Sequence, residues 1–139
     1  MYIDTSVAIK LYVDEPDSLE CERTVRRAPL VSSRLLFCEF RSALVGKVGR
    51  GAISAQLYTE IWGQFQRDIA ELRITLIPLD DVLVENASDL LAELQARVPV
   101  RTLDALHLAT CLSVDAGPLF TRDTRMLEAA VCLGMPVTG

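Results

Sequence analysis

The sequence lacks the features of membrane-spanning and secreted proteins. No run approaches the ~18 uninterrupted apolar residues that a transmembrane helix requires. The first four residues carry a carboxylate at position 4, and no basic-then-apolar signal peptide follows them. We therefore expect a cytoplasmic protein that makes no use of a membrane.

Paired cysteines are also lacking. Cys21, Cys38, Cys111 and Cys132 are widely spaced, form no C-x-x-C pair and lie in apolar stretches with a helical pattern. Zinc sites favour closely paired thiolates, which this spacing does not supply. We interpret the four cysteines as reduced thiols that behave as small apolar side chains.

Proteins that coat nucleic acids usually carry more basic than acidic residues, and this sequence does not. Its 19 acidic and 14 basic residues give a net charge of −5. This balance argues against a general nucleic-acid coat. It leaves room for an enzyme whose acids gather at a metal site and whose arginines contact phosphates locally.

No repeat, low-complexity run or linker divides the chain, so we expect one domain over residues 1–139. A domain of this size buries roughly two-thirds of its unfolded surface. Short apolar runs alternate with longer helical patterns, which indicates a mainly parallel sheet of about five short strands covered by helices. The expected strands are 1–4, 30–32, 73–78, 118–121 and 135–138. The expected helices are 6–13, 17–27, 34–48, 57–72, 102–114 and 124–133, together with one that contains 83–94 and that Asp80 or Asp81 caps. The second of them begins with capping-box spacing between Asp17 and Glu20.

Four acidic residues stand in surroundings that do not suit a solvated charge. Asp4 ends the first expected strand, and Asp123 follows the strand before the last helix. The carboxyl ends of parallel strands form the binding crevice of open α/β sheets. Glu39 and Asp104 lie among apolar neighbours on expected helices. Strand ends and helices of this kind meet at one edge of an α/β sandwich, so we expect the four acids to converge.

Each acid also has an ordinary interpretation. Asp4 and Asp123 can cap the helices that follow them. Glu39 can be a partly exposed helix residue, and Asp104 can pair with Arg101 one turn earlier. These alternatives stay open for each acid taken alone.

Converging carboxylates need a cation. Like charges ~4 Å apart repel by about 4 kcal/mol at an effective dielectric near 20. Carboxylate-rich, all-oxygen sites suit Mg²⁺ or Mn²⁺, and such an ion can activate water for phosphodiester hydrolysis. Without metal, replacing Asp4 or Asp104 by Asn should then stabilise the protein by about 1 kcal/mol.

Hydroxyl groups near the strand ends fit this site as supporting residues. Ser6 or Thr5 can orient the first acid, and Thr121 can act in the same way beside Asp123, although hydroxyls in such places more often cap helices. His107 is the only histidine and lies one turn beyond Asp104. We interpret it as a core histidine and exclude it from catalysis.

These residues resemble the signature segments of PIN domains. The segments are MYIDTS at 1–6, the helix that contains Glu39, RTLDALHLA at 101–109 and LFTRD at 119–123, in the family's order. The resemblance implies a PIN-like three-layer α/β/α sandwich and an endoribonuclease that depends on Mg²⁺ or Mn²⁺. Its metal-binding and catalytic residues would be Asp4, Glu39, Asp104 and Asp123.

The compact length is similar to that of VapC toxins within this family. That resemblance implies a homodimer that a small antitoxin protein neutralises. Apolar residues on two adjacent short helices exceed what a core should need, and we predict that part of this surface receives an antitoxin helix or strand. The residues concerned are Leu11, Tyr12, Leu36, Phe37 and Phe40.

Other interpretations of the same pattern remain. A phosphatase with an aspartyl nucleophile usually carries a second acid two residues later, where Ser6 stands. A dinucleotide-binding domain needs G-x-G-x-x-G after the first strand, whereas the glycine cluster at 46–51 follows a helix. A non-catalytic interaction module on the same fold is the remaining alternative, and four retained acids count against it. We expect hydrolysis of single-stranded or looped RNA that leaves a 5′-phosphate and a 3′-hydroxyl.

Overall fold

A parallel sheet lies at the centre of the molecule. The computed structural model describes residues 1–138, and Gly139, the last residue of the predicted domain, lies outside the described residues. The sheet has five strands in the order β3-β2-β1-β4-β5, all parallel, as expected. All strands but β2 are shorter than the sequence indicated. The five strands are β1 (Tyr2–Ile3), β2 (Leu30–Ser33), β3 (Ile74–Ile77), β4 (Leu119–Phe120) and β5 (Val137–Thr138).

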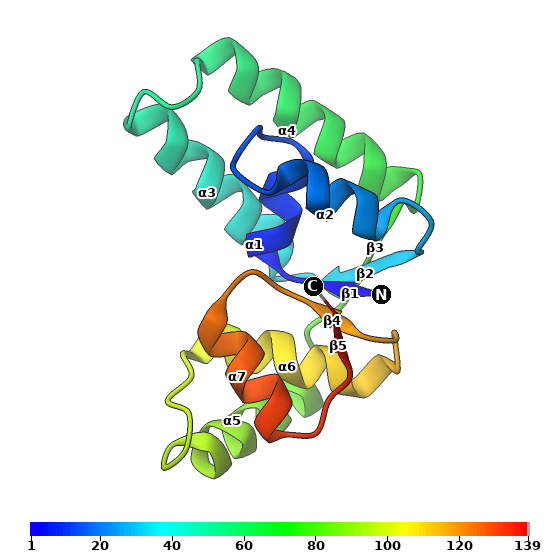
Figure 1. Ribbon diagram of the computed structural model, residues 1–139, viewed down its shortest axis with the longest axis vertical. Helices are drawn as coiled ribbons and strands as arrows, with labels where there is room; N and C mark the ends of the chain where they lie inside the picture. Colours follow the sequence, from blue (N-terminus) through cyan, green and yellow to red (C-terminus); the bar gives the residue numbers. More distant parts are fainter. Residues whose placement is uncertain (139) are drawn as a thin grey trace.

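Helices cover both faces of this sheet, which confirms the three-layer α/β/α sandwich (Figure 1). The helices α1 (Thr5–Ala8), α2 (Ser18–Val25), α3 (Leu36–Gly49) and α4 (Ala55–Ala70) form one layer, and the short 3₁₀ helix η1 (Ile9–Leu11) continues α1. The other layer contains α5 (Asp81–Leu94), α6 (Thr102–Val114) and α7 (Thr124–Cys132). None of the helices described here is long and apolar enough to cross a bilayer.

The division into two layers follows from the strand order. From β1 to β3 the chain moves toward one edge of the sheet, and from β3 through β4 to β5 it moves toward the other. Right-handed crossovers in opposite directions place their helices on opposite faces. The order reverses beside β1, and ligands bind at such switch points in open parallel sheets.

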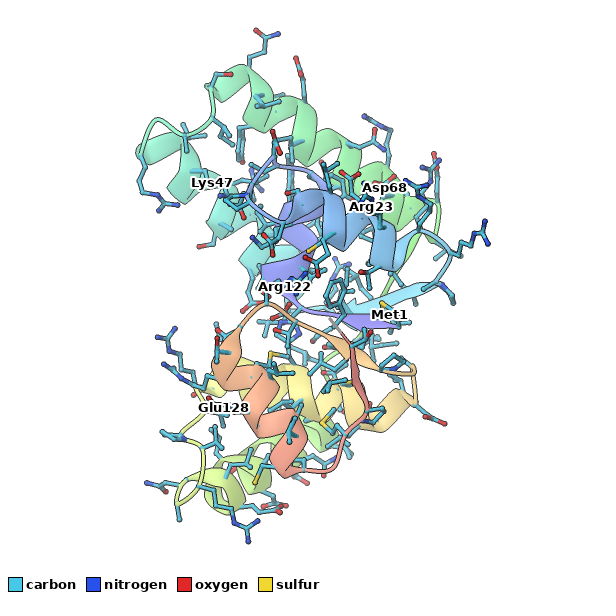
Figure 2. All side chains as sticks on the ribbon, in the orientation of Figure 1. Met1, Arg23, Lys47, Asp68, Arg122 and Glu128 are labelled. Atoms are coloured by element: carbon cyan, nitrogen blue, oxygen red, sulfur yellow. The ribbon has the colours of Figure 1, made fainter. Side chains whose placement is uncertain are left out.

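Alternation within the short strands divides the core in two. Tyr2 and Leu119 point toward α5, α6 and α7, whereas Ile3 and Phe120 point toward α1 to α4. All four side chains are fully buried. Successive strand residues face opposite sides of a sheet, so even two-residue strands anchor both layers. Charged tips extend mostly outward from the helices, as Figure 2 shows.

Part of the apolar surface that we predicted for an antitoxin belongs to this core. Leu36 and Phe40 are fully buried. Phe40 stacks on Phe65 of α4 with 4.0 Å between the ring centroids, and Tyr12 meets both rings edge-on. The prediction was therefore wrong for Leu36 and Phe40, because α4 supplies the aromatic surface that covers them. The other three predicted residues are half-buried.

Leu72, directly after α4, carries a backbone strain that substitution should relieve. Its φ is 58°, and its side chain is 74% exposed. The left-handed conformation costs a non-glycine residue about 1–2 kcal/mol. The exposed side chain of Leu72 buries little apolar surface, so its packing compensates for little of this cost. Leu72→Gly is therefore expected to raise the free energy of unfolding by about 0.5–1 kcal/mol in urea titrations. Leu57→Gly, at an exposed position inside α4, should instead lower it by about 1 kcal/mol. Destabilisation by both changes would contradict the strain argument.

Candidate active site at the carboxyl edge of the sheet

Asp4 is the most deeply buried of the four predicted acids, with 4% of its surface exposed at the end of β1. Its Oδ1 accepts hydrogen bonds from the Ser6 hydroxyl at 2.7 Å and from the Val7 amide at 3.2 Å. Its Oδ2 accepts one from the Thr121 hydroxyl at 2.7 Å. Burial raises the pKa of Asp4, and the surrounding donors oppose this rise. Ser6 thus makes the contact that we predicted for it, whereas the Thr121 hydroxyl, which we expected to orient Asp123, donates to Asp4 instead.

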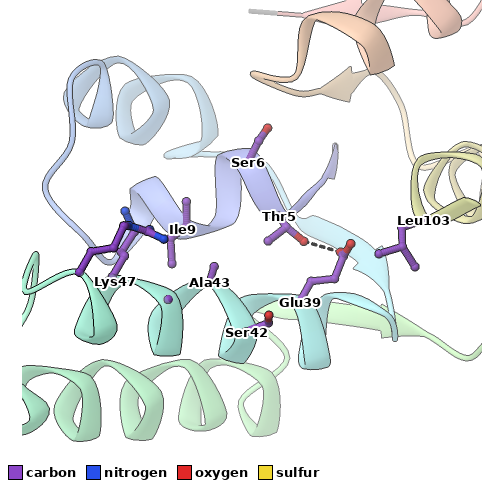
Figure 3. Close-up of a pocket in the computed structure, with 10 residues that line it drawn as sticks. Thr5, Ser6, Ile9, Glu39, Ser42, Ala43, Lys47 and Leu103 are labelled. Carbon is purple, nitrogen blue, oxygen red and sulfur yellow. Dashed lines mark hydrogen bonds between the residues drawn. The ribbon is translucent and has the colours of Figure 1, made fainter. Parts of the chain in front are cut away.

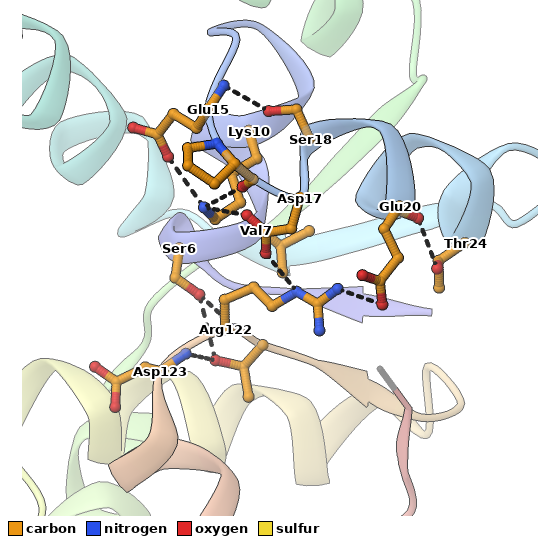
Figure 4. A network of polar contacts seen from close by, with 12 residues as sticks. Ser6, Val7, Lys10, Glu15, Asp17, Ser18, Glu20, Thr24, Arg122 and Asp123 are labelled. Atoms are coloured by element: carbon orange, nitrogen blue, oxygen red, sulfur yellow. Dashed lines mark hydrogen bonds and ion pairs between the residues drawn. The ribbon is translucent and has the colours of Figure 1, made fainter.

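The same two hydroxyls hold the segment that follows β4 (Figure 4). Ser6 Oγ accepts from the Arg122 amide at 2.8 Å, and Thr121 Oγ1 accepts from the Asp123 amide at 3.0 Å. Each hydroxyl therefore donates to Asp4 and accepts from the backbone next to it. Shared hydroxyls connect Asp4 and the backbone of Asp123 across the switch point of the sheet.

Asp123 and Asp104 both cap helices. Asp123 Oδ1 accepts from the backbone amides of Arg125 and Met126 at 2.9 and 3.1 Å, at the start of α7. Asp104 Oδ2 accepts from the backbone amide of Arg101 at 3.1 Å, at the start of α6. The ordinary interpretation of both residues therefore holds in part, and for Asp104 the partner is the amide of Arg101 rather than its guanidinium.

The surroundings of Asp104 differ from those that we expected. The first turn of α6 is exposed, so Asp104 is half-buried rather than enclosed by apolar neighbours. An Asn there would weaken a helix cap without relieving a buried charge. The expected stabilisation by Asn in the absence of metal therefore no longer applies to Asp104 and rests on Asp4.

Glu39 lies in the first turn of α3 and is held by one of its two oxygens. Its Oε2 accepts from the Thr5 hydroxyl at 2.5 Å and from His107 Nε2 at 2.7 Å. Burial opposes the charge on Glu39, but the hydrogen bonds from His107 and Thr5 bring the pKa of Glu39 below its ordinary value. Of the two hydroxyls considered for Asp4, Ser6 binds Asp4 and Thr5 binds Glu39.

His107 is a core histidine, as expected, but it also contacts a predicted catalytic acid, which the sequence did not reveal. It is buried, and its two ring nitrogens contact Tyr2 and Glu39. Its place on an apolar helix near Asp104 suggested only core packing. Glu39 lies 68 residues earlier in the chain, and no local spacing links the two.

A cavity of about 490 Å³ opens beside Glu39 (Figure 3). Thr5, Ser6 and Glu39 form its acidic and hydroxylated wall. Lys47 and Arg50, at the end of α3, form a basic wall. The cavity therefore brings two cationic side chains close to a predicted catalytic acid.

A network of ion pairs ties α2 to the segment after β4 (Figure 4), and Lys47 of α3 joins it through Glu15. Asp17, which we expected to start a capping box, makes no such bond and pairs with Lys10 and Arg122 instead. The capping-box prediction was wrong because the backbone of Asp17 is left-handed and its carboxylate binds Lys10 and Arg122 instead of the backbone amides of α2. The network positions Arg122, whose amide binds Ser6. Its pairs are Lys47–Glu15, Lys10–Glu15, Lys10–Asp17, Arg122–Asp17 and Arg122–Glu20.

The donor atoms of the site fit a divalent cation. Glu39, Asp104 and Asp123 each have one carboxylate oxygen in hydrogen bonds and one that accepts none from residues 1–138. Oxygen ligands of this kind suit Mg²⁺ or Mn²⁺. In the described part of the chain, no three His, Cys, Asp or Glu side chains lie close enough to form a metal-binding group. Convergence of the four acids on a metal stays a prediction.

Comparison with known proteins gives two matches. The family model for the PIN domain matches residues 1–131. The chain is also 40% identical over 140 residues to "Ribonuclease VapC46" of Mycobacterium tuberculosis, and the match covers 99% of this chain and 95% of that protein. The matched region contains all four acids, Ser6, Thr121 and His107.

Proposed function

Because this chain belongs to the PIN-domain family, we propose that it is an endoribonuclease that hydrolyses RNA phosphodiester bonds and serves as the toxin of a toxin–antitoxin pair. The observation that carries the proposal is the edge of the sheet where Asp4 and Glu39 are held by hydroxyl donors next to a basic cavity wall. The similarity to a relative named a ribonuclease supports the same activity.

In this proposal Asp4, Glu39, Asp104 and Asp123 hold one or two divalent cations, Mg²⁺ or Mn²⁺. A cation bound there supplies a water of lowered pKa and neutralises charge that develops on the phosphate. The protein contributes fixed ligands: Ser6 and Thr121 hold Asp4, and backbone amides hold Asp104 and Asp123. Ligands that are already oriented need little rearrangement when the cation and the substrate bind.

The substrate proposed is single-stranded or looped RNA. Its backbone and bases are accessible, whereas a paired A-form helix offers a deep, narrow major groove that side chains cannot read. Lys47 and Arg50 line the same cavity as Glu39, and in this proposal that wall contacts phosphates of the RNA. Lys47 is paired with Glu15, so Arg50 is the cation of this wall that no ion pair within residues 1–138 engages.

A small antitoxin and a second copy of the chain are the proposed protein partners, as the resemblance to VapC toxins implies. The half-buried residues Leu11, Tyr12 and Phe37 remain the candidate antitoxin surface. We further propose that residues 1–139 act as a single nuclease domain in the cytoplasm.

A non-catalytic interaction module on the same fold is the second candidate. The observation that favours it is that Asp104 and Asp123 already serve as helix caps, which is reason enough for either acid to be present. A cation-dependent activity separates the two functions, because a module that only binds partners has no use for a reactive water.

Purified protein is expected to cleave single-stranded RNA in Mg²⁺ or Mn²⁺ and to be inactive in excess EDTA, because the acids need a cation to act. Gel analysis of labelled RNA and mass spectrometry of the ends should show 5′-phosphate and 3′-hydroxyl products. Cleavage that persists in EDTA, or 2′,3′-cyclic phosphate ends, would exclude water attack. Absence of cleavage with either cation would favour the interaction module.

A further inference from the structure

A chain of hydrogen bonds connects the backbone of β2 to Glu39. The Ser33 amide donates to Tyr2 Oη at 3.0 Å, Tyr2 Oη lies 2.8 Å from His107 Nδ1, and His107 Nε2 lies 2.7 Å from Glu39 Oε2. Tyr2 and His107 are 0% and 3% exposed. Four elements, β2, β1, α6 and α3, thus meet in one polar path that runs from the buried Tyr2 and His107 to the half-buried Glu39.

The chemistry of the groups gives this path a direction. An amide N–H only donates, so the Tyr2 oxygen accepts from Ser33. Tyr2 then has one proton to give, and its near neighbour in the path is His107 Nδ1. A ring that accepts at Nδ1 carries its proton at Nε2, where it donates to the carboxylate of Glu39. A Tyr2 hydroxyl that donates to Nδ1 therefore favours the neutral form of His107 whose Nε2–H donates to Glu39.

Both donors to Glu39 reach the same oxygen. Thr5 from α1 and His107 from α6 bind Oε2, and Oε1 accepts no hydrogen bond from residues 1–138. Glu39 lines the cavity between α1 and α3. With Oε2 held from two sides, rotation of the carboxylate is hindered, and Oε1 is the oxygen left for a cation or a water.

We propose that Tyr2 and His107 are positioning residues of the nuclease site, which hold Glu39 so that Oε1 serves the cavity; this rests on the proposed function. An imidazole surrounded by apolar side chains is unfavourable unless both of its nitrogens are bound, and here both are. An apolar residue would fill the layer equally well. Groups that orient a metal-binding side chain typically contribute about 10–100-fold to activity or metal affinity.

The ring of His107 can be observed directly, because the chain has only one histidine. Nitrogen-15 spectra of the metal-free wild type are expected to show Nε2 protonated and Nδ1 unprotonated. Tyr2→Phe removes the hydroxyl that selects this form, so a mixture of the two neutral forms is expected. A wild-type ring without a proton on Nε2 would overturn the proposal. An unchanged spectrum in Tyr2→Phe would remove Tyr2 from it.

His107→Gln and His107→Asn form a matched pair for activity. The Gln amide nitrogen reaches roughly the position of Nε2 and keeps the donor to Glu39, whereas the shorter Asn does not. His107→Asn should lower kcat by about 10–100-fold with a smaller change in KM for RNA, and should weaken binding of Mn²⁺ alone, measured by calorimetry. His107→Gln should recover most of both. Equal losses in the two variants, or no loss in His107→Asn, would overturn the proposal.

Folding is checked by the amide spectrum of each variant. If His107→Asn does not fold, Tyr2→Phe decides, since it removes one oxygen atom and leaves His107 in place. Its kcat should fall by about 10-fold, and wild-type kcat would overturn the role of Tyr2. A wild type that cleaves no RNA defeats the proposed function, whereas the ring spectrum still tests the hydrogen-bond path. If the wild type cleaves RNA and His107→Asn cleaves it equally fast, the proposed function stands and the positioning role of His107 is contradicted.

Discussion

Replacing Asp4 by Asn is expected to lower the rate of RNA cleavage by at least about 100-fold, because groups that merely orient a ligand already contribute 10–100-fold. Asp4 is buried at the switch point of the sheet and accepts hydrogen bonds from the hydroxyls of Ser6 and Thr121. The Asn side chain keeps the shape but loses the charge that attracts a cation. One of its ends would also turn an N–H₂ group toward a hydroxyl that donates.

The same variant separates a metal site from a simple helix cap. In EDTA, Asp4→Asn should be more stable than the wild type by about 1 kcal/mol, since burial disfavours the charged carboxylate. At ten times its dissociation constant, Mg²⁺ should stabilise the wild type by about 1.4 kcal/mol and should leave Asp4→Asn unaffected. Thermal melts with and without Mg²⁺ measure both effects.

Asp89→Asn is the control, because it makes the same chemical change at an exposed position on α5. It should keep wild-type cleavage and the wild-type response to Mg²⁺. If Asp4→Asn melts at a lower temperature than the wild type in EDTA, and the wild type does not respond to Mg²⁺, the site is a cap and holds no metal.

Phe65→Ala is expected to lower the free energy of unfolding by about 3–5 kcal/mol, the largest stability effect that we predict. Phe65 is fully buried and stacks on Phe40, and the rings of Tyr12 and Trp62 lie 5.8 and 5.7 Å from it. Removing its ring leaves a void at the contact of α3 and α4 that these fixed neighbours cannot fill. The melting temperature should fall by roughly 10 °C or more.

Phe65→Leu is the matched control, since it keeps most of the apolar volume and should lose clearly less stability than the Ala variant. Urea denaturation with a common slope for all three proteins gives the comparison. A loss below about 1 kcal/mol for Phe65→Ala would mean that the aromatic cluster is not a tightly packed core.

Local pattern was sufficient to determine the elements of this fold. The periods of apolar residues predicted the parallel sheet and its covering helices, and α6 has the predicted bounds. The pattern also placed Asp4 at the end of β1 and Asp123 after β4. These features depend on residues a few positions apart, and parallel strands bring their carboxyl ends to one edge by geometry alone.

Tertiary structure alone decided which side chains meet. Glu39 binds His107, 68 residues away, and Asp17 binds cations instead of capping α2. Phe40 lies in the core because Phe65 of α4 stacks on it. Each outcome depends on how two elements distant in sequence are rotated toward one another, and a spacing within one element carries no information about that rotation.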